Sequence, residues 1–191
     1  MKLILASASP RRAAVLADAG ISFEAVATRV DESPRRNEPP EELVQRLAEA
    51  KARFAAARAA GPAIVVGADT EVVINGHVLG KPASADDARR MLQELSGTTH
   101  RVITGLAAIR EPDGAARREL ETTQVTFAPL TPEEIDEYVA SGEPFDKAGA
   151  YAIQGRAGRF VTRVEGCYFN VVGLPLAQLY RILRELGWTA E

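Results

Sequence analysis

Residues 7–12 read Ser-Ala-Ser-Pro-Arg-Arg and follow a short apolar run directly. The run predicts a short buried strand over residues 2–6. Ser9 stands where a helix N-cap is expected, Pro10 suits the first helical position, and Gly20 suits the position after the helix end. The junction therefore predicts a strand that turns directly into a helix, which is a building unit of α/β proteins.

Helical and extended patterns alternate along the rest of the chain. Asn75-Gly76 favours a type I′ turn in a hairpin, and residues 31–40 are polar and proline-rich, as in a loop. The predicted strands are 22–27, 63–67, 71–74, 77–79, 101–110 and 121–128, with loop and strand over 149–155. The predicted helices are 41–60, 84–95, 131–142 and one after Pro175. Since neither a repeat nor a linker interrupts this order, we expect one α/β domain with a mixed sheet over residues 1–191.

The helix predicted over residues 41–60 carries apolar residues at helical spacing. The expected buried stripe is Leu43, Leu47, Ala50 and Phe54. Lys51 is expected beside this stripe, at the border of the buried face.

Composition narrows the class of protein. The 191 residues are 46% hydrophobic and 26% charged, with a net charge of −3, which is typical of a soluble globular protein and argues against a general nucleic-acid binder. A single cysteine, Cys167, excludes an internal disulfide and disfavours a structural zinc site. No apolar run reaches the length of a membrane span or a signal-peptide core. We therefore expect a cytoplasmic protein that binds neither membrane nor nucleic acid.

The strand-to-helix junction has the chemistry of an anion site. A helix N-terminus offers unpaired backbone N–H groups, and Arg11 and Arg12 add donors suited to phosphate oxygens. Ser7 and Ser9 add hydroxyl groups, at the sheet edge where open α/β sheets bind ligands. An ordinary helix start with solvated arginines explains these residues equally well when they are taken alone.

Four further stretches carry charged side chains of interest. Asp69, expected just past the end of the strand over 63–67, can hold a divalent cation or take a proton from water, but an aspartate that forms a turn is a common alternative. Lys51 and Lys81 can bind phosphate, although each alone is typical of a protein surface. Glu32 can coordinate a metal or orient Arg12, or be a solvated charge.

Gln154 lies among glycines and alanines in residues 146–155, which suggests a shallow ligand pocket. An amide donates and accepts hydrogen bonds in one plane. This pattern matches the edge of uracil or thymine, and it matches guanine equally well.

Taken together and in this order, these stretches resemble the Maf family of nucleotide pyrophosphatases. The motifs are Ser-Ala-Ser-Pro-Arg-Arg (7–12), Ala-Glu-Ala-Lys-Ala (48–52), Gly-Ala-Asp-Thr (67–70), Gly-Lys-Pro (80–82), Leu-Ser-Gly-Thr-Thr-His-Arg-Val-Ile-Thr-Gly (95–105) and Asp-Lys-Ala-Gly-Ala-Tyr-Ala-Ile-Gln-Gly (146–155). The resemblance implies an elongated mixed sheet flanked by helices, in two lobes with a central cleft, similar to inosine triphosphate pyrophosphatases. It also implies hydrolysis of a nucleoside triphosphate to the monophosphate and pyrophosphate.

The resemblance assigns expected roles to the residues. Asp69 would be the base that activates water for attack on the α-phosphorus, with Glu32 assisting the arginines or the metal, and Mg²⁺ or Mn²⁺ would be bound by Asp69 and Glu32. The expected triphosphate ligands are Ser9, Arg11, Arg12, Lys51 and Lys81.

Arg12, Thr70 and Gln154 have the form expected of the family branch that acts on dTTP and UTP. The intact motif at 146–155 carries most of this assignment, because the branch that acts on 7-methyl-GTP differs around the later two markers. The resemblance also implies a homodimer. Glu71 stands where an apolar residue is expected. Its alternatives are a second carboxylate near the metal and a position in solvent, and we expect solvent because the hairpin begins there.

A regulatory role in cell division is the alternative function, because members of this family have been linked to septum formation. A bare interaction surface does not require Asp69, Lys51, Lys81 and the arginine pair together. The sequence therefore favours the enzyme.

Overall fold

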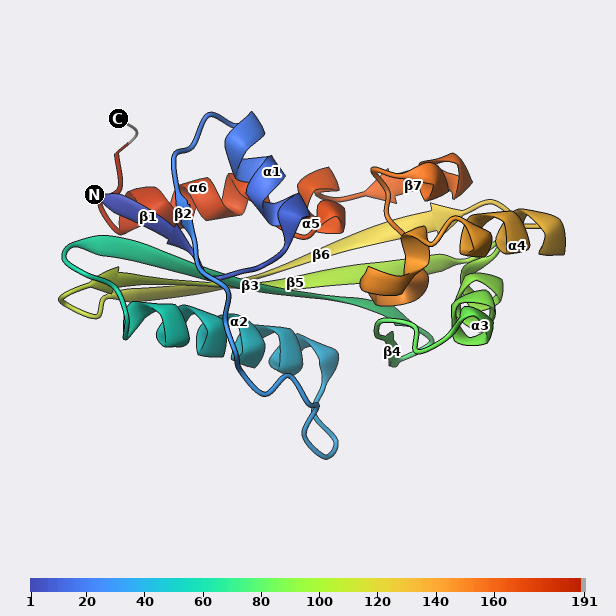
Figure 1. The fold of residues 1–191 in the computed structure, drawn as a ribbon, viewed down its shortest axis with the longest axis horizontal. Coiled ribbons are helices and arrows are strands. Elements are labelled where there is room, and N and C mark those ends of the chain that lie inside the picture. The colour runs from blue at the N-terminus through green and yellow to red at the C-terminus, as the bar shows by residue number, and fades with distance from the viewer. Residues whose placement is uncertain (190–191) are drawn as a thin grey trace. The chain divides into compact units, whose positions relative to one another are not determined.

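The computed structural model describes residues 1–189, whose strands form one mixed seven-stranded sheet (Figure 1). The strand order is β2-β1-β3-β5-β6-β7, and β4 pairs with β3. The strands are β1 (Lys2–Leu5), β2 (Glu24–Ala25), β3 (Ala63–Ile74), β4 (His77–Leu79), β5 (Thr99–Glu111), β6 (Ala116–Phe127) and β7 (Val161–Glu165). The α-helices are α1 (Pro10–Asp18), α2 (Pro40–Ala56), α3 (Ala85–Leu95), α4 (Pro132–Ala140), α5 (Tyr168–Val172) and α6 (Leu176–Glu185). The α/β class with a mixed sheet is confirmed, and no helix in residues 1–189 is long and apolar enough to cross a membrane.

The chain divides into two compact units, in agreement with the expected two lobes. The first unit holds residues 1–69, 104–121 and 173 onward, and the second holds residues 70–103 and 122–172. Each unit has its own cluster of buried apolar side chains. The cleft that the resemblance implies stays a prediction.

In the first unit, the predicted junction of strand and helix is confirmed. β1 pairs in parallel with β3, from Lys2 opposite Ala63 to Leu5 opposite Val66. The chain then leaves the sheet, and α1 begins at Pro10 with Ser9 as its N-cap. In this unit α2 covers one face of the sheet, while α1 and α6 lie on the other (Figure 1).

The face of α2 that is buried differs from the predicted stripe. The buried residues are Leu43, Val44, Leu47, Ala48, Lys51, Ala52, Ala55 and Ala56, whereas Ala50 and Phe54 are only partly buried. The cause is close packing: a Cβ on Gly67 of β3 would lie 2.1 Å from the Ala48 carbonyl oxygen. A helix that approaches a sheet so closely turns its small side chains inward, so Lys51 lies within the buried face and not at its border.

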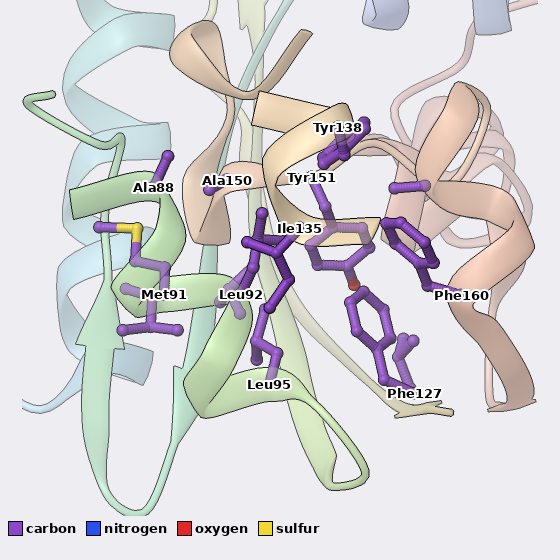
Figure 2. Packing of buried hydrophobic residues seen from close by; sticks show 14 of the residues in the cluster. Ala88, Met91, Leu92, Leu95, Phe127, Ile135, Tyr138, Ala150, Tyr151 and Phe160 are labelled. Carbon is purple, nitrogen blue, oxygen red and sulfur yellow. The ribbon is translucent and has the colours of Figure 1, made fainter. Parts of the chain in front are cut away.

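In the second unit, aromatic side chains pack at the centre of the core (Figure 2). Phe127 contacts the rings of His100 and Tyr151 edge to face, and Tyr138 contacts Phe160 in the same way. The predicted features here are largely confirmed: Asn75-Gly76 forms the hairpin turn, Ser84 caps α3, and a capping box begins α4.

Two strand predictions are wrong. β3 does not end at Gly67 but continues through residues 68–70 to Ile74. The small residues here do not end the strand, because they leave room for α2 to pack closely against it. Within residues 149–155 no strand forms, since Gly149 and Ala150 both have positive φ, which a strand does not allow. The extended segment lies further on, as β7, which pairs with β6 and escaped prediction.

Three smaller predictions are also corrected. β2 is only two residues long. α2 ends at Ala56 rather than at residue 60, because the next turn tightens: the amide of Arg58 donates to the Ala55 carbonyl instead of continuing the α-helical pattern. Glu71 does not point into solvent, since its side chain is partly buried and its Oε2 atom is inaccessible.

Candidate active site

The N-terminus of α1 is built as the sequence predicts. The Ser9 hydroxyl accepts a hydrogen bond from the Arg12 amide at 3.5 Å, and Ser9 itself donates its amide to the Ser7 hydroxyl at 3.2 Å. This helix start lies just beyond the carboxyl end of β1, whose last residue, Leu5, pairs with Val66 in the middle of β3. The remaining backbone donors of the first turn favour an anion here.

Arg12 is held by one contact to a distant part of the chain and one within its own motif. Its Nε donates to the Gly173 carbonyl at 2.7 Å, and its Nη1 donates to the Ser7 hydroxyl at 3.3 Å. Burial lowers the pKa of Arg12, and the neighbouring charge of Arg11 also lowers it, while the charge of Asp69 opposes the shift. The guanidinium is therefore partly buried and held in one orientation, which suits it to a phosphate group.

Lys51 and Asp69 form a buried ion pair. Because side chains two residues apart on a strand face the same side, Asp69 shares with Gly67 the face of β3 that packs against α2. Lys51 lies on the opposing face of α2, and its Nζ is 2.6 Å from Asp69 Oδ1. Each residue is only 7% exposed.

The Asp69 carboxylate has the properties of a general base. Its Oδ1 contacts Lys51, whereas its buried Oδ2 has no hydrogen-bond partner among the described residues. Burial raises the pKa of Asp69, although the positive charges of Lys51 and Arg12 oppose the shift. A carboxylate with a raised pKa and an unoccupied acceptor can take a proton from water.

Glu32 reaches the same lysine from the loop before α2. Its Oε1 lies 2.7 Å from Lys51 Nζ, and its side chain is 54% exposed. Arg46 of α2 holds this loop, since its Nη2 donates to the Ser33 carbonyl at 3.0 Å and its Nε lies 2.5 Å from Glu38 Oε1. Arg46 therefore keeps Glu32 next to the buried ion pair.

Two carboxylate oxygens thus converge on one cationic group. Carboxylate oxygens are ligands that Mg²⁺ and Mn²⁺ prefer, and Mg²⁺ in nucleotide enzymes is held by one or two carboxylates together with substrate phosphates. The donor set of Asp69 and Glu32 fits that arrangement. Among the described residues, no group of three or more His, Cys, Asp or Glu side chains is placed to hold a metal without substrate.

The structure brings together only part of the predicted set. Asp69, Lys51 and Glu32 are in direct contact, and the charges of Arg11 and Asp69 both act on Arg12. The other three predicted residues belong to the second unit: Thr70 is partly buried on β3, and Lys81 and Gln154 are exposed in loops.

The structure adds contacts for Ser7, which the sequence already places at the anion site, and for Gly173, which the sequence does not indicate. Ser7 is buried and accepts hydrogen bonds from Ser9 and Arg12. The Gly173 carbonyl accepts from Arg12, which lies 161 positions away along the chain. The motif at 7–12 contains a signal for Ser7, but no local pattern marks the Gly173 carbonyl, because every residue has such a group.

An α/β fold with a helix N-terminus just beyond β1, an oriented arginine and a buried lysine–aspartate pair between α2 and β3 defines a protein that can bind and hydrolyse a phosphate anhydride. The family model of Maf-like proteins matches residues 2–186, and the chain belongs to this family.

Relatives agree with this assignment, and one solved structure is similar in fold. A protein of Moorella thermoacetica named dTTP/UTP pyrophosphatase is 53% identical, with 97% of this chain and 95% of that protein covered. One of Geobacillus sp. (strain WCH70) with the same name is 50% identical, with 98% and 99% covered. The Staphylococcus aureus Ham1 protein is similar in fold, with a TM-score of 0.53 at 15% identity and coverage of 97% and 99%.

Proposed function

We propose that this protein hydrolyses dTTP and UTP to the nucleoside monophosphate and pyrophosphate. The names of relatives at 53% and 50% identity over nearly the full length support this activity and substrate class. The observation that carries the proposal is the Asp69 carboxylate, buried against Lys51 with its second oxygen unpartnered among the described residues, and close enough to Arg12 to act on its pKa.

The proposed reaction needs one base and one leaving group. Asp69 accepts a proton from a water molecule as the water oxygen attacks the α-phosphorus of the triphosphate. A bond forms between that oxygen and the α-phosphorus, and the bond from the α-phosphorus to the bridging oxygen of the β-phosphate breaks. Pyrophosphate leaves with the electron pair of that bond, and no covalent enzyme intermediate is required.

The cationic groups of the first unit orient the phosphate chain. The start of α1 supplies backbone donors and the Ser9 hydroxyl, and Arg11 and Arg12 supply guanidinium groups. Arg12 is held in place before substrate arrives, so little orientation entropy is lost when it binds phosphate. Its charge then offsets the negative charge that builds on the leaving pyrophosphate.

Asp69 and Glu32 are the residues proposed to hold a divalent cation, Mg²⁺ or Mn²⁺. Such a cation, when bound, would offset the negative charge of the phosphate groups.

Residues of the second unit complete the proposal. Lys81 is assigned to the phosphate chain and Gln154 to the edge of the pyrimidine, where an amide can donate and accept in one plane. Thr70 is assigned to substrate binding with them. The single functional domain over residues 1–191, the homodimer and the cytoplasmic location stay predictions.

The experiment that tests this function is pyrophosphate release from a panel of canonical and modified nucleoside triphosphates, with Mg²⁺ or Mn²⁺. We expect release to be fastest with dTTP and UTP. Asp69→Asn removes the base and is expected to lower kcat by about 100-fold or more. Asp113→Asn, in the exposed turn before β6, is the matched control and should keep wild-type activity. Absence of release from every triphosphate by the wild type would overturn the proposed activity.

A further inference from the structure

The ammonium group of Lys51 forms ion pairs with two acidic side chains and is therefore not available to bind an anion. Its Nζ lies 2.6 Å from Asp69 Oδ1 and 2.7 Å from Glu32 Oε1, from two different elements of the first unit. The lysine is buried, so these carboxylates replace the water that an ammonium group normally holds. A lysine that served only to bind phosphate would have no need of two acidic partners.

The two oxygens that hold the ammonium group are the same two that fit a divalent cation. A divalent cation bound between Asp69 and Glu32 would lie within a few ångströms of the lysine charge, where repulsion between like charges is strong because the site is largely buried. The ammonium and the metal therefore exclude each other from this position.

From this overlap we infer that Lys51 is an internal competitor of the divalent cation. In the nucleotide-free protein its ammonium occupies the position between Asp69 and Glu32. When a triphosphate arrives, the flexible lysine side chain swings to the phosphate oxygens and frees both carboxylates for the cation. This inference rests on the proposed function for the nature of the anion, but the competition itself needs no nucleotide.

Such competition makes Lys51 a positioning residue that couples two ligands. The effect of one ligand on the affinity for the other is always mutual. Nucleotide that draws Lys51 away therefore strengthens metal binding, and bound metal strengthens nucleotide binding by the same factor. Without nucleotide, Lys51 also keeps Asp69 Oδ1 occupied. The structure thus provides a physical reason why the metal would bind together with its substrate and not before it.

The test is the affinity for Mn²⁺ without nucleotide, measured by electron paramagnetic resonance of the free ion. Lys51→Met and Lys51→Gln remove the competing charge and are expected to bind Mn²⁺ about tenfold more tightly than the wild type. Lys51→Arg keeps the charge and should stay as weak as the wild type. Adding Asp69→Asn to Lys51→Met should abolish the gain, which assigns the bound ion to this site.

Lys2→Met is the matched control, because Lys2 also pairs with a glutamate, Glu24, but on the surface. It should leave Mn²⁺ affinity unchanged. If folded Lys51→Met and Lys51→Gln bind Mn²⁺ no more tightly than the wild type, the inference is wrong. Failure of the proposed function is a separate result, since it would appear as absent pyrophosphate release by the wild type.

A second measurement, of melting temperature with and without Mn²⁺, tests the inference even if the variants are less stable than the wild type. Removing the lysine leaves a buried carboxylate without its partner, which lowers the melting temperature. Mn²⁺ should then raise the melting temperature of Lys51→Met or Lys51→Gln by more than it raises that of the wild type, because the ion replaces the missing charge. An equal rise in wild type and variants would contradict competition.

Discussion

At the scale of single residues, Arg12 illustrates how orientation adds to charge. Its guanidinium donates through Nε to the Gly173 carbonyl and through Nη1 to Ser7, which fixes the plane of the fork. Partial burial lowers its pKa and reduces the screening of its charge by solvent. A lysine at this position would keep the positive charge but lose the several N–H donors that a guanidinium holds in one plane.

Arg12→Lys is therefore expected to lower kcat/KM for dTTP by about 10- to 100-fold, through both KM and kcat. Steady-state kinetics of pyrophosphate release measure this effect. Arg53→Lys, on the exposed side of α2 and paired with Glu49, is the control and should change neither constant. Wild-type kinetics for Arg12→Lys would show that the planar guanidinium makes no essential hydrogen bonds to the substrate.

At the scale of elements, the contact between α2 and the sheet sets the position of the Lys51–Asp69 pair. A Cβ on Gly67 would lie 2.1 Å from the Ala48 carbonyl oxygen, and one on Gly105 would lie 2.4 Å from that of Val44. Both obstacles are helix backbone, which cannot move aside as a side chain can. The glycines therefore let α2 approach β3 and β5 closely enough for Lys51 to reach Asp69.

Gly67→Ala is expected to lower the free energy of unfolding by about 3 kcal/mol and to lower activity further than stability alone explains. The first effect comes from the clash, and the second from the displacement of Lys51. Denaturant titration and pyrophosphate release measure the two. Gly80→Ala is the matched control, because a Cβ there meets no atom within 4 Å. Unchanged stability of Gly67→Ala would mean that α2 does not pack this closely.

At the scale of the whole molecule, stability should depend on pH through His100. This residue is buried in the second unit, with its Nε2 atom 2.8 Å from the Tyr151 hydroxyl, and burial lowers its pKa from 6.5 to about 4. Between these values the unfolded chain binds a proton that the folded chain does not. The free energy of unfolding therefore falls as the pH drops from 6.5 towards 4, by about 1.4 kcal/mol per pH unit.

His100→Phe keeps an aromatic ring and removes the titrating group, so its stability should fall less steeply over this range of pH. Chemical denaturation of wild type and variant at pH 7, 6, 5 and 4.5 gives the slopes. Parallel slopes for His100→Phe and wild type would exclude His100 as the cause. Glu38, whose pKa is lowered to about 2 chiefly by its hydrogen bond to Arg46, gives a separate loss of stability below pH 4.5.

Local patterns predicted the elements whose signals lie close together in the chain. Ser9 with Pro10, Asn75 with Gly76, and Thr131 with Glu134 each act within a few residues, so their helix starts and turns were predicted from sequence. The errors occurred where a distant contact decides the conformation. Small residues at 67–68 predict a strand end, yet they continue β3 because α2 packs against them.

The sequence by itself determined the α/β class, the helix N-terminus at 7–12 and the types of residue that serve the proposed chemistry, because these depend on local spacing and on side-chain type. Only the tertiary structure decided that Lys51 is buried, that Asp69 and Glu32 converge on its ammonium group, and that Gly173 orients Arg12. These contacts join residues far apart in the chain. They arise from how closely α2 packs on the sheet and from where the loops return, neither of which a local pattern records.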